Sequence, residues 1–243
     1  MRARAFKHDR IWGLVLIAFA PAQLLYLYLD VILLAPPDPD APIAEFRALA
    51  SNHAALIRWH ALIPPINFLV LLLPASVALA RRLRQAAPGS FWPEMVVPGS
   101  LLLSMTAVIG LQLFAVLGLV PVHELSDSAI RSAIMINAFL IWVVGSFAAA
   151  LLAGSVSLAL LHADPRPRML VAFGLTAAGC GLAGQVWLVD GDFHGPLFGL
   201  NLLGRGLFLA WVVWAGIWLV RSPVSDERGR ASPGLTSLGR AVS

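Results

Sequence analysis

Charged residues are scarce in this 243-residue sequence, where they make up only 12% of the chain. A soluble domain usually carries about 25% charged residues. Hydrophobic residues, in contrast, make up 59% of the sequence. Because a water-soluble fold cannot bury that much apolar surface, the composition excludes an ordinary soluble domain and predicts an integral membrane protein.

Cysteine occurs once, as Cys180 within an apolar run. A single cysteine excludes an intrachain disulfide, a paired-cysteine metal motif and covalent attachment of haem. The sequence also lacks a Walker motif, a nucleophile elbow and a dinucleotide fingerprint, which argues against a nucleotide-driven pump or a familiar hydrolase. The basic residues lie in small groups between apolar runs, so the net charge of +4 indicates membrane orientation and not a nucleic-acid partner.

Six apolar runs are long enough to cross a membrane, whose hydrocarbon core of about 30 Å requires about 20 apolar residues. They cover residues 11–34, 56–80, 96–120, 133–161, 169–189 and 197–220. The first run continues to Leu34, which is too long for the apolar part of a cleaved signal, so we expect it to be retained. The sequence therefore predicts an all-α membrane bundle of about six transmembrane helices in one domain, residues 1–221, followed by a disordered cytoplasmic tail over 222–243.

The distribution of Arg and Lys predicts the orientation, because loops rich in these residues stay in the cytoplasm. With the amino terminus inside, 13 of the 17 basic residues fall on the inner side. The outer side holds Arg47, Arg58, Arg131 and Arg205, together with 8 of the 13 acidic residues. We therefore expect both termini to lie in the cytoplasm.

Small residues recur along the fourth and fifth apolar runs, as expected where membrane helices pack closely. The fourth run has Gly145, Ala149, Ala153 and Ser157, and the fifth has Gly174, Ala177, Ala178, Gly181 and Gly184. We expect these two helices to pack against each other, or against another subunit in a homo-oligomer or a larger membrane complex.

The segment before the second run is amphipathic. Its apolar face follows spacings of three and four residues: Ile43, Phe46, Ala50, His53 and Ile57. This pattern predicts a short helix on the outer membrane surface that leads into the second span. Within that span, Pro64, Pro65 and Pro74 remove backbone donors and favour kinks.

Polar residues are few within the apolar runs, and in hydrocarbon such residues tend to face the interior of a bundle. Arg205 is the most informative, because it lies about two helical turns into the sixth run. Its candidate partners are Asp30 and Asp190, in an ion pair that locks helices together, and the alternative is that Arg205 binds a ligand. The candidate ligand-binding residues are Asp30, Gln112, Asn137, Gln185, Asp190, Asn201 and Arg205.

Histidines and carboxylates gather on the predicted outer side. His60, His123 and His194 are candidate ligands for zinc or copper, and a metal-bound water would then supply a nucleophile. Because no two of them have the spacing of a helical metal motif, histidines in solvated loops are the competing interpretation. No histidine lies at the middle of an apolar run, which argues against a haem held within the membrane. The sequence requires no cofactor.

The fourth run leads into the segment 161–168, Leu-His-Ala-Asp-Pro-Arg-Pro-Arg, and then into the Gly-rich fifth run. In this succession of spans, most of the chain resembles a family of bacterial multi-helix membrane proteins known only as a domain of unknown function. The resemblance implies a multi-pass protein of the bacterial cytoplasmic (inner) membrane. It assigns no role to any residue.

Three functions are compatible with these features. The first is binding or transport of a small molecule through a polar site in the outer half of the bundle. The second is a metal-dependent membrane enzyme that uses the outer histidines and carboxylates, and the third is a non-catalytic subunit of a membrane complex. No internal duplication indicates the inverted repeats of many transporters. We favour the first function, and enzymatic activity remains open.

Overall fold

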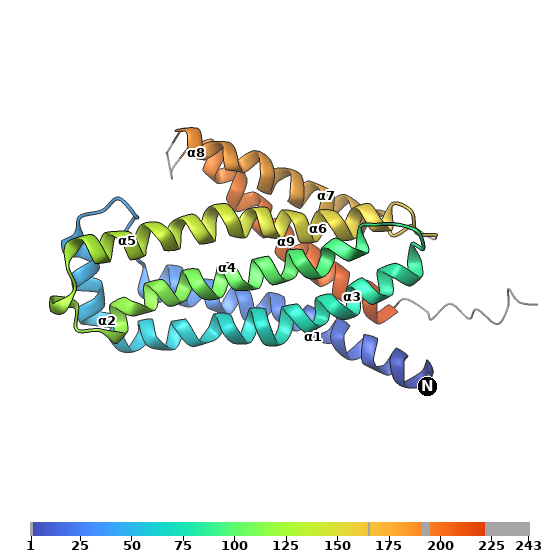
Figure 1. Ribbon diagram of the computed structural model, residues 1–243, viewed down its shortest axis with the longest axis horizontal. Coiled ribbons are helices and arrows are strands. Elements are labelled where there is room, and N and C mark those ends of the chain that lie inside the picture. The colour runs from blue at the N-terminus through green and yellow to red at the C-terminus, as the bar shows by residue number, and fades with distance from the viewer. Residues whose placement is uncertain (1, 165, 191–194, 222–243) are drawn as a thin grey trace, which may run out of the picture.

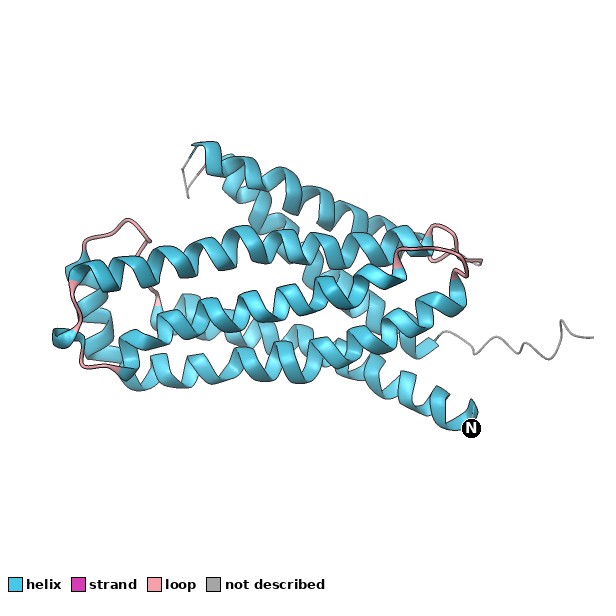
Figure 2. Cartoon of the chain, in the orientation of Figure 1, coloured by secondary structure: helices cyan, strands magenta, loops and turns pink. Residues whose placement is uncertain are grey.

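The computed structural model describes the backbone of residues 2–164, 166–190 and 195–221, and the side chains of 9–164, 166–188 and 195–221. Every element in these ranges is a helix, and the helices form one elongated bundle (Figures 1 and 2), which confirms the predicted all-α class. Short π- and 3-10-helical elements carry the symbol η. In chain order the elements are α1 (Arg2–Tyr28), η1 (Leu29–Leu34), α2 (Ile43–Pro64), η2 (Pro65–Leu72), α3 (Leu73–Ala86), α4 (Pro93–Leu119), η3 (Val122–Glu124), α5 (Asp127–Ala138), η4 (Phe139–Val144), α6 (Gly145–Leu160), α7 (Arg168–Ala183), η5 (Gly184–Val186), α8 (Trp187–Asp190) and α9 (Pro196–Arg221).

Six helical segments are long and apolar enough to span a membrane, which confirms the predicted number. They are Asp9–Leu34, Ile43–Ala86, Pro93–Leu119, Asp127–Leu160, Arg168–Val186 and Pro196–Arg221. The second and fourth begin well before the apolar runs that predicted them. The predicted tail over 222–243 lies outside the described residues.

The second span is one helical segment of 44 residues, made of α2, η2 and α3. α2 changes direction at His53, whose backbone is not helical (φ −127°, ψ 19°). The part of α2 before this kink crosses one end of the bundle (Figure 1). Its Phe46 is 1% exposed and packs with buried residues of α4 and α5, such as Phe114 and Ile130. The prediction that this apolar face lies on the membrane surface is therefore wrong, since the face caps the bundle.

The six spans close into a ring. α1 packs against α9, α9 against α7, α7 against α6, α6 against α4 and α4 against α2 and α3, while η2 and α3 return to α1. One hydrophobic core extends from the middle of the ring to the end that holds the α3–α4 connection, and it includes Leu152 and Trp211. A second core lies at the opposite end, where the start of α2 packs against α4 and α5. We call this opposite end the η3 end.

Small residues allow α7 to contact two neighbouring helices closely. A Cβ atom on Gly154 of α6 would lie 3.6 Å from the Cβ of Ala178. On the other side, a Cβ atom on Gly204 of α9 would come within 2.7 Å of the Gly181 nitrogen. The predicted packing between the helices of the fourth and fifth runs is therefore confirmed within one chain, and packing with another subunit stays a prediction.

Three elements are π-helical, namely η1, η2 and η4. η2 begins at Pro65, directly after Pro64, because proline has no N–H and interrupts the α-helical hydrogen bonds. In η4, the Gly145 N–H donates to Leu140 O, five residues back, and not to Ile141 O. π-helical turns occur frequently at functional sites. Each of these three elements contributes side chains to the pocket described below.

α1 and α9 cross on the side of the α3–α4 connection and diverge towards the η3 end (Figure 1). At the crossing, a Cβ atom on Gly13 would lie 2.8 Å from Gly216 O, and one on Gly216 would lie 2.7 Å from Gly13 O. The two backbones therefore touch at this point. Beyond it, the space between the helices belongs to a pocket.

Candidate ligand-binding pocket

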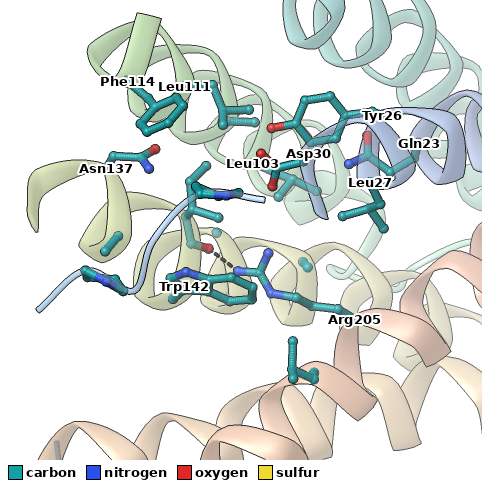
Figure 3. Close-up of a pocket in the computed structure, with 18 of the residues that line it drawn as sticks. Gln23, Tyr26, Leu27, Asp30, Leu103, Leu111, Phe114, Asn137, Trp142 and Arg205 are labelled. Atoms are coloured by element: carbon teal, nitrogen blue, oxygen red, sulfur yellow. Dashed lines mark hydrogen bonds between the residues drawn. The ribbon is translucent and has the colours of Figure 1, made fainter. Parts of the chain in front are cut away.

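A pocket of about 490 Å³ lies inside the ring, between α1, α4, η4 and α9. Its aromatic walls are formed by Phe19, Phe68, Phe114, Trp142, Phe198 and Phe208. Its polar side chains are Gln23, Tyr26, Asp30, Asp38, Asn137 and Arg205. Figure 3 labels all of these except Asp38. Small-molecule sites typically have about this volume (roughly 300–1,000 Å³) and a few polar groups in an apolar lining. The pocket is therefore the candidate binding site.

Neutral groups hold the Arg205 guanidinium on one side of the pocket. Its Nε donates to Ser146 Oγ at 3.2 Å and to Asn201 Oδ1 at 3.3 Å. Its Nη2 donates to Ser146 Oγ at 3.1 Å and to Ile141 O. The guanidinium also lies over the ring of Trp142, with Cζ 4.3 Å from the ring centroid. These contacts fix the direction of the charged group without neutralising its charge.

The π-helical geometry of η4 explains why Ile141 can accept a side-chain hydrogen bond. In an α-helix its carbonyl would accept the N–H of Gly145, but that N–H donates to Leu140. The Ile141 carbonyl instead accepts from Arg205 Nη2, as the dashed line in Figure 3 shows. The Trp142 carbonyl likewise accepts from Asn201 Nδ2 at 3.2 Å. The backbone of η4 thus forms part of the site that holds the arginine.

No Asp or Glu carboxylate among the described side chains lies within 4.0 Å of the Arg205 guanidinium. The predicted pairing with Asp30 is therefore wrong, and the side chain of Asp190 lies outside the described residues. Arg205 Nη1 has no hydrogen-bond partner within the described ranges. Figure 3 shows the guanidinium across the pocket from Asp30 and Tyr26. A partly buried cation with only neutral partners lacks the anion that usually compensates for its burial.

Three titratable side chains lie together on the other side of the pocket. His60 Nε2 lies 3.1 Å from Asp30 Oδ1, and the His60 ring stacks on Tyr26 with 4.5 Å between the ring centroids. His60 is 1% exposed. Its contact with Asp30 is short enough for an ion pair but lacks hydrogen-bond geometry, so neither ring nitrogen has a hydrogen-bond partner in the described part of the chain. Tyr26 and Asp30 line the pocket. The pocket therefore has a cationic wall and an acidic wall that do not pair with each other directly.

Asn137 also lines the pocket, as the sequence predicted for a ligand-binding residue. Its Oδ1 is buried and has no hydrogen-bond partner among the described residues. Gln23 Oε1, on the α1 wall, is likewise buried and has no hydrogen-bond partner among the described residues. Buried polar atoms are nearly always hydrogen-bonded, so these two oxygens are exceptions beside the pocket. Both are shielded in this conformation, and a ligand donor reaches them only after the amide group turns towards the pocket.

Gln112, another predicted ligand-binding residue, does not line the pocket. Its Nε2 donates to Ala61 O at 2.7 Å. In an α-helix this carbonyl would accept the N–H of the residue four positions ahead, but that residue is Pro65, which has none. Gln112 therefore replaces a hydrogen bond that proline removes, which is a structural role.

Gln185 and Asn201 lie behind the pocket wall. Asn201 is fully buried, and its Oδ1 accepts from Ser146 Oγ at 2.9 Å as well as from Arg205. Gln185 Nε2 donates to Gly181 O at 3.2 Å and to Trp142 O at 3.4 Å. Both residues support Arg205 and η4 from behind. Of the seven predicted residues, the pocket thus brings together Asp30, Asn137 and Arg205.

The predicted metal ligands do not form a cluster in the described part of the chain. No three His, Cys, Asp or Glu side chains come together there in an arrangement that could hold a metal ion. His60 is buried beside Asp30, whereas His123 is 81% exposed and lies 3.8 Å from Glu124. His194 lies outside the described residues.

Sequence reasoning missed Trp142 and Ser146, which hold Arg205. Ser146 lies in a small-residue run, where its hydroxyl could not be distinguished from a packing residue. Trp142 did leave a signal, because it lies deep in the fourth apolar run and away from the membrane interfaces where tryptophan is usually found.

Comparison of the chain with protein-family models, with curated proteins and with solved structures finds no match.

Proposed function

We propose that this protein binds a small organic anion in the pocket, either to carry it across the membrane or to respond to it. The single observation behind this proposal is the Arg205 guanidinium, which lies in the pocket wall with neutral partners and no carboxylate among the described side chains within 4.0 Å. A carboxylate or another oxyanion at Nη1 would supply the missing charge, in the strong type of hydrogen bond that arginine makes with anions. Ser146, Asn201 and Ile141 bind Nε and Nη2 of Arg205, which leaves Nη1 to donate to the ligand.

The remaining walls favour an organic ligand over an inorganic ion. The lining is mainly aromatic, and a small ion such as chloride would leave most of the 490 Å³ unused. Asn137 and Gln23 each add one acceptor without a partner in the described chain. An acid with an apolar body and one or two donor groups therefore matches the pocket.

We further propose that both termini face the cytoplasm, which places the pocket in the outer half of the membrane. The excess of Arg and Lys on the side of the termini supports this orientation. The resemblance to bacterial multi-helix proteins supports the bacterial cytoplasmic membrane as the location.

Thermal unfolding of the purified full-length protein in lipid nanodiscs tests the ligand class. A ligand that binds only the folded state raises the unfolding temperature. Three series of the same carbon skeletons are compared: carboxylic acids, primary amines and alcohols. We expect stabilisation by the acids alone, and its loss in Arg205→Gln.

Arg58→Gln provides the matched control, because Arg58 is an exposed arginine of α2 that does not line the pocket. The acids should stabilise this variant as they stabilise the unchanged protein. Stabilisation by amines or alcohols alone would contradict the proposal, as would equal stabilisation of Arg205→Gln by the acids.

A further inference from the structure

The pocket reaches the flank of the molecule between α1 and α9. Two of its lining residues are also exposed there, Leu27 of α1 at 38% and Leu202 of α9 at 46%. Both residues lie inside segments that are long and apolar enough to span a membrane. An exposed side chain within such a segment faces lipid, so these two leucines form an edge of the pocket on the lipid side.

The course of the two helices explains this opening. α1 and α9 touch at Gly13 and Gly216 and diverge from there towards the η3 end (Figure 1). No Cβ atom can be accommodated at that crossing without a shift, which fixes the point from which the helices separate. Leu27 and Leu202 lie beyond the crossing, on the diverging parts.

The η3 end of the pocket is only partly covered. Residues 36–39 of the α1–α2 connection line the pocket there together with Phe46, which is 1% exposed. Pro36 and Asp38 are exposed, so the edge of the pocket continues from the lipid-facing leucines to a polar edge at the end of the first candidate span. An apolar edge that joins a polar edge matches a molecule with an apolar chain and a polar head.

We infer that the ligand reaches Arg205 from the lipid phase through the opening between Leu27 and Leu202, and that it is a single-chain amphiphilic acid. This inference rests on the proposed function, since it assigns the anionic head to Arg205. The apolar chain lies against the aromatic wall and extends between the two leucines. A diacyl lipid is larger than the drug-sized ligands that pockets of roughly 300–1,000 Å³ enclose, so a single chain fits better.

Binding of tritiated dodecanoate to the full-length protein in phosphatidylcholine nanodiscs tests the inference. Leu27→Trp and Leu202→Trp narrow the opening, and both side chains are replaced together in a third variant. We expect the association rate to fall at least about tenfold in the double variant, because a restricted path slows association. The matched controls are Leu25→Trp and Leu203→Trp, at 59% and 53% exposure on the same helices but outside the pocket lining. Their rates should equal that of the unchanged protein.

Two comparisons test the lateral path and the proposed anion binding separately. Benzoate, a compact acid with no chain, should also compete with dodecanoate at Arg205, but its own association rate should be less affected by the tryptophans. If dodecanoate binds and the double variant associates as fast as the controls, the lateral path is wrong while the anion site stands. If neither acid binds the unchanged protein, or if Arg205→Gln binds both equally well, the proposed function itself is wrong.

Discussion

The Arg205 guanidinium lies over the Trp142 indole, with 4.3 Å between Cζ and the ring centroid. Trp142 belongs to η4, whose neighbouring carbonyl at Ile141 accepts a hydrogen bond from the same guanidinium. One short π-helical element therefore supplies both an aromatic face and a backbone acceptor to a single cation. Because the two contacts approach from different directions, they restrict both the position and the tilt of the guanidinium.

Replacing Trp142 should therefore weaken binding of the anion without removing its charge partner. A cation–π contact contributes about 0.5–2 kcal/mol, so Trp142→Leu should weaken the affinity for an organic acid by roughly 2- to 30-fold. Trp142→Phe keeps an aromatic face and should lose less. Isothermal titration in nanodiscs measures these affinities. Trp214→Leu, which removes a 41% exposed tryptophan of α9, is the control and should bind normally.

Gln112 and Asn137 allow stability and binding to be separated, because both were predicted ligand-binding residues and the structure gives them opposite roles. Gln112→Leu leaves the Ala61 carbonyl without a donor, which should destabilise the protein by about 1–3 kcal/mol and leave acid binding unchanged. Asn137→Leu removes a buried oxygen that has no partner in the described chain, so the unfolding temperature should stay the same or rise.

The two variants are compared by thermal unfolding and by titration with the acid that stabilises the unchanged protein most. Asn137→Leu should weaken the binding of acids that carry an additional donor group, and affect acids without one much less. A loss of affinity in Gln112→Leu equal to that in Asn137→Leu would show that Gln112 contacts the ligand after all.

Close packing of α7 and α9 predicts a difference between two glycines of one helix. A Cβ atom on Gly204 would come within 2.7 Å of the Gly181 nitrogen, whereas one on Gly206 would meet nothing within 4 Å. Gly204→Ala should therefore lower stability by about 1–3 kcal/mol, the usual cost of overpacking. Gly206→Ala should be neutral or slightly stabilising, because alanine favours helix more than glycine does. Thermal unfolding of both variants checks this, and equal effects would contradict the close contact.

Hydropathy predicted the six spans correctly because the length and composition of a transmembrane helix are properties of a local stretch of sequence. The same stretch does not determine how a helix is rotated or tilted, since packing against neighbours decides both. For this reason the partner of Arg205 could not be predicted: Asp30 lies at a suitable depth, but it faces His60. The location of the amphipathic segment starting at Ile43 was mispredicted for a similar reason. Its pattern indicates an apolar face without showing whether lipid or protein covers that face.

The residues of the candidate pocket were predicted in part. Arg205, Asp30 and Asn137 stood out as polar residues in apolar runs, and all three line the pocket. Trp142 could not be assigned to it, because its role depends on the shift of hydrogen bonds in η4, and no residue in that element is a proline or glycine that would indicate the change.

The orientation of the chain leads to a final prediction, which uses the single cysteine. In a Cys180→Ala background, a cysteine at Asn52, exposed in α2, should react with a membrane-impermeant maleimide added to intact cells. A cysteine at Asp164, exposed after α6, should react only after the cells are opened. Asn52 precedes the kink at His53, in the part of α2 that crosses the end of the bundle. The rest of the second candidate span and the whole of the third and fourth lie between it and Asp164, so three crossings place the two positions on opposite sides of the membrane. The reverse pattern would invert the orientation inferred from the Arg and Lys distribution and move the pocket to the cytoplasmic half. Labelling of both positions from outside would mean that one of the intervening helices does not cross the membrane, because an even number of crossings returns the chain to the side from which it started.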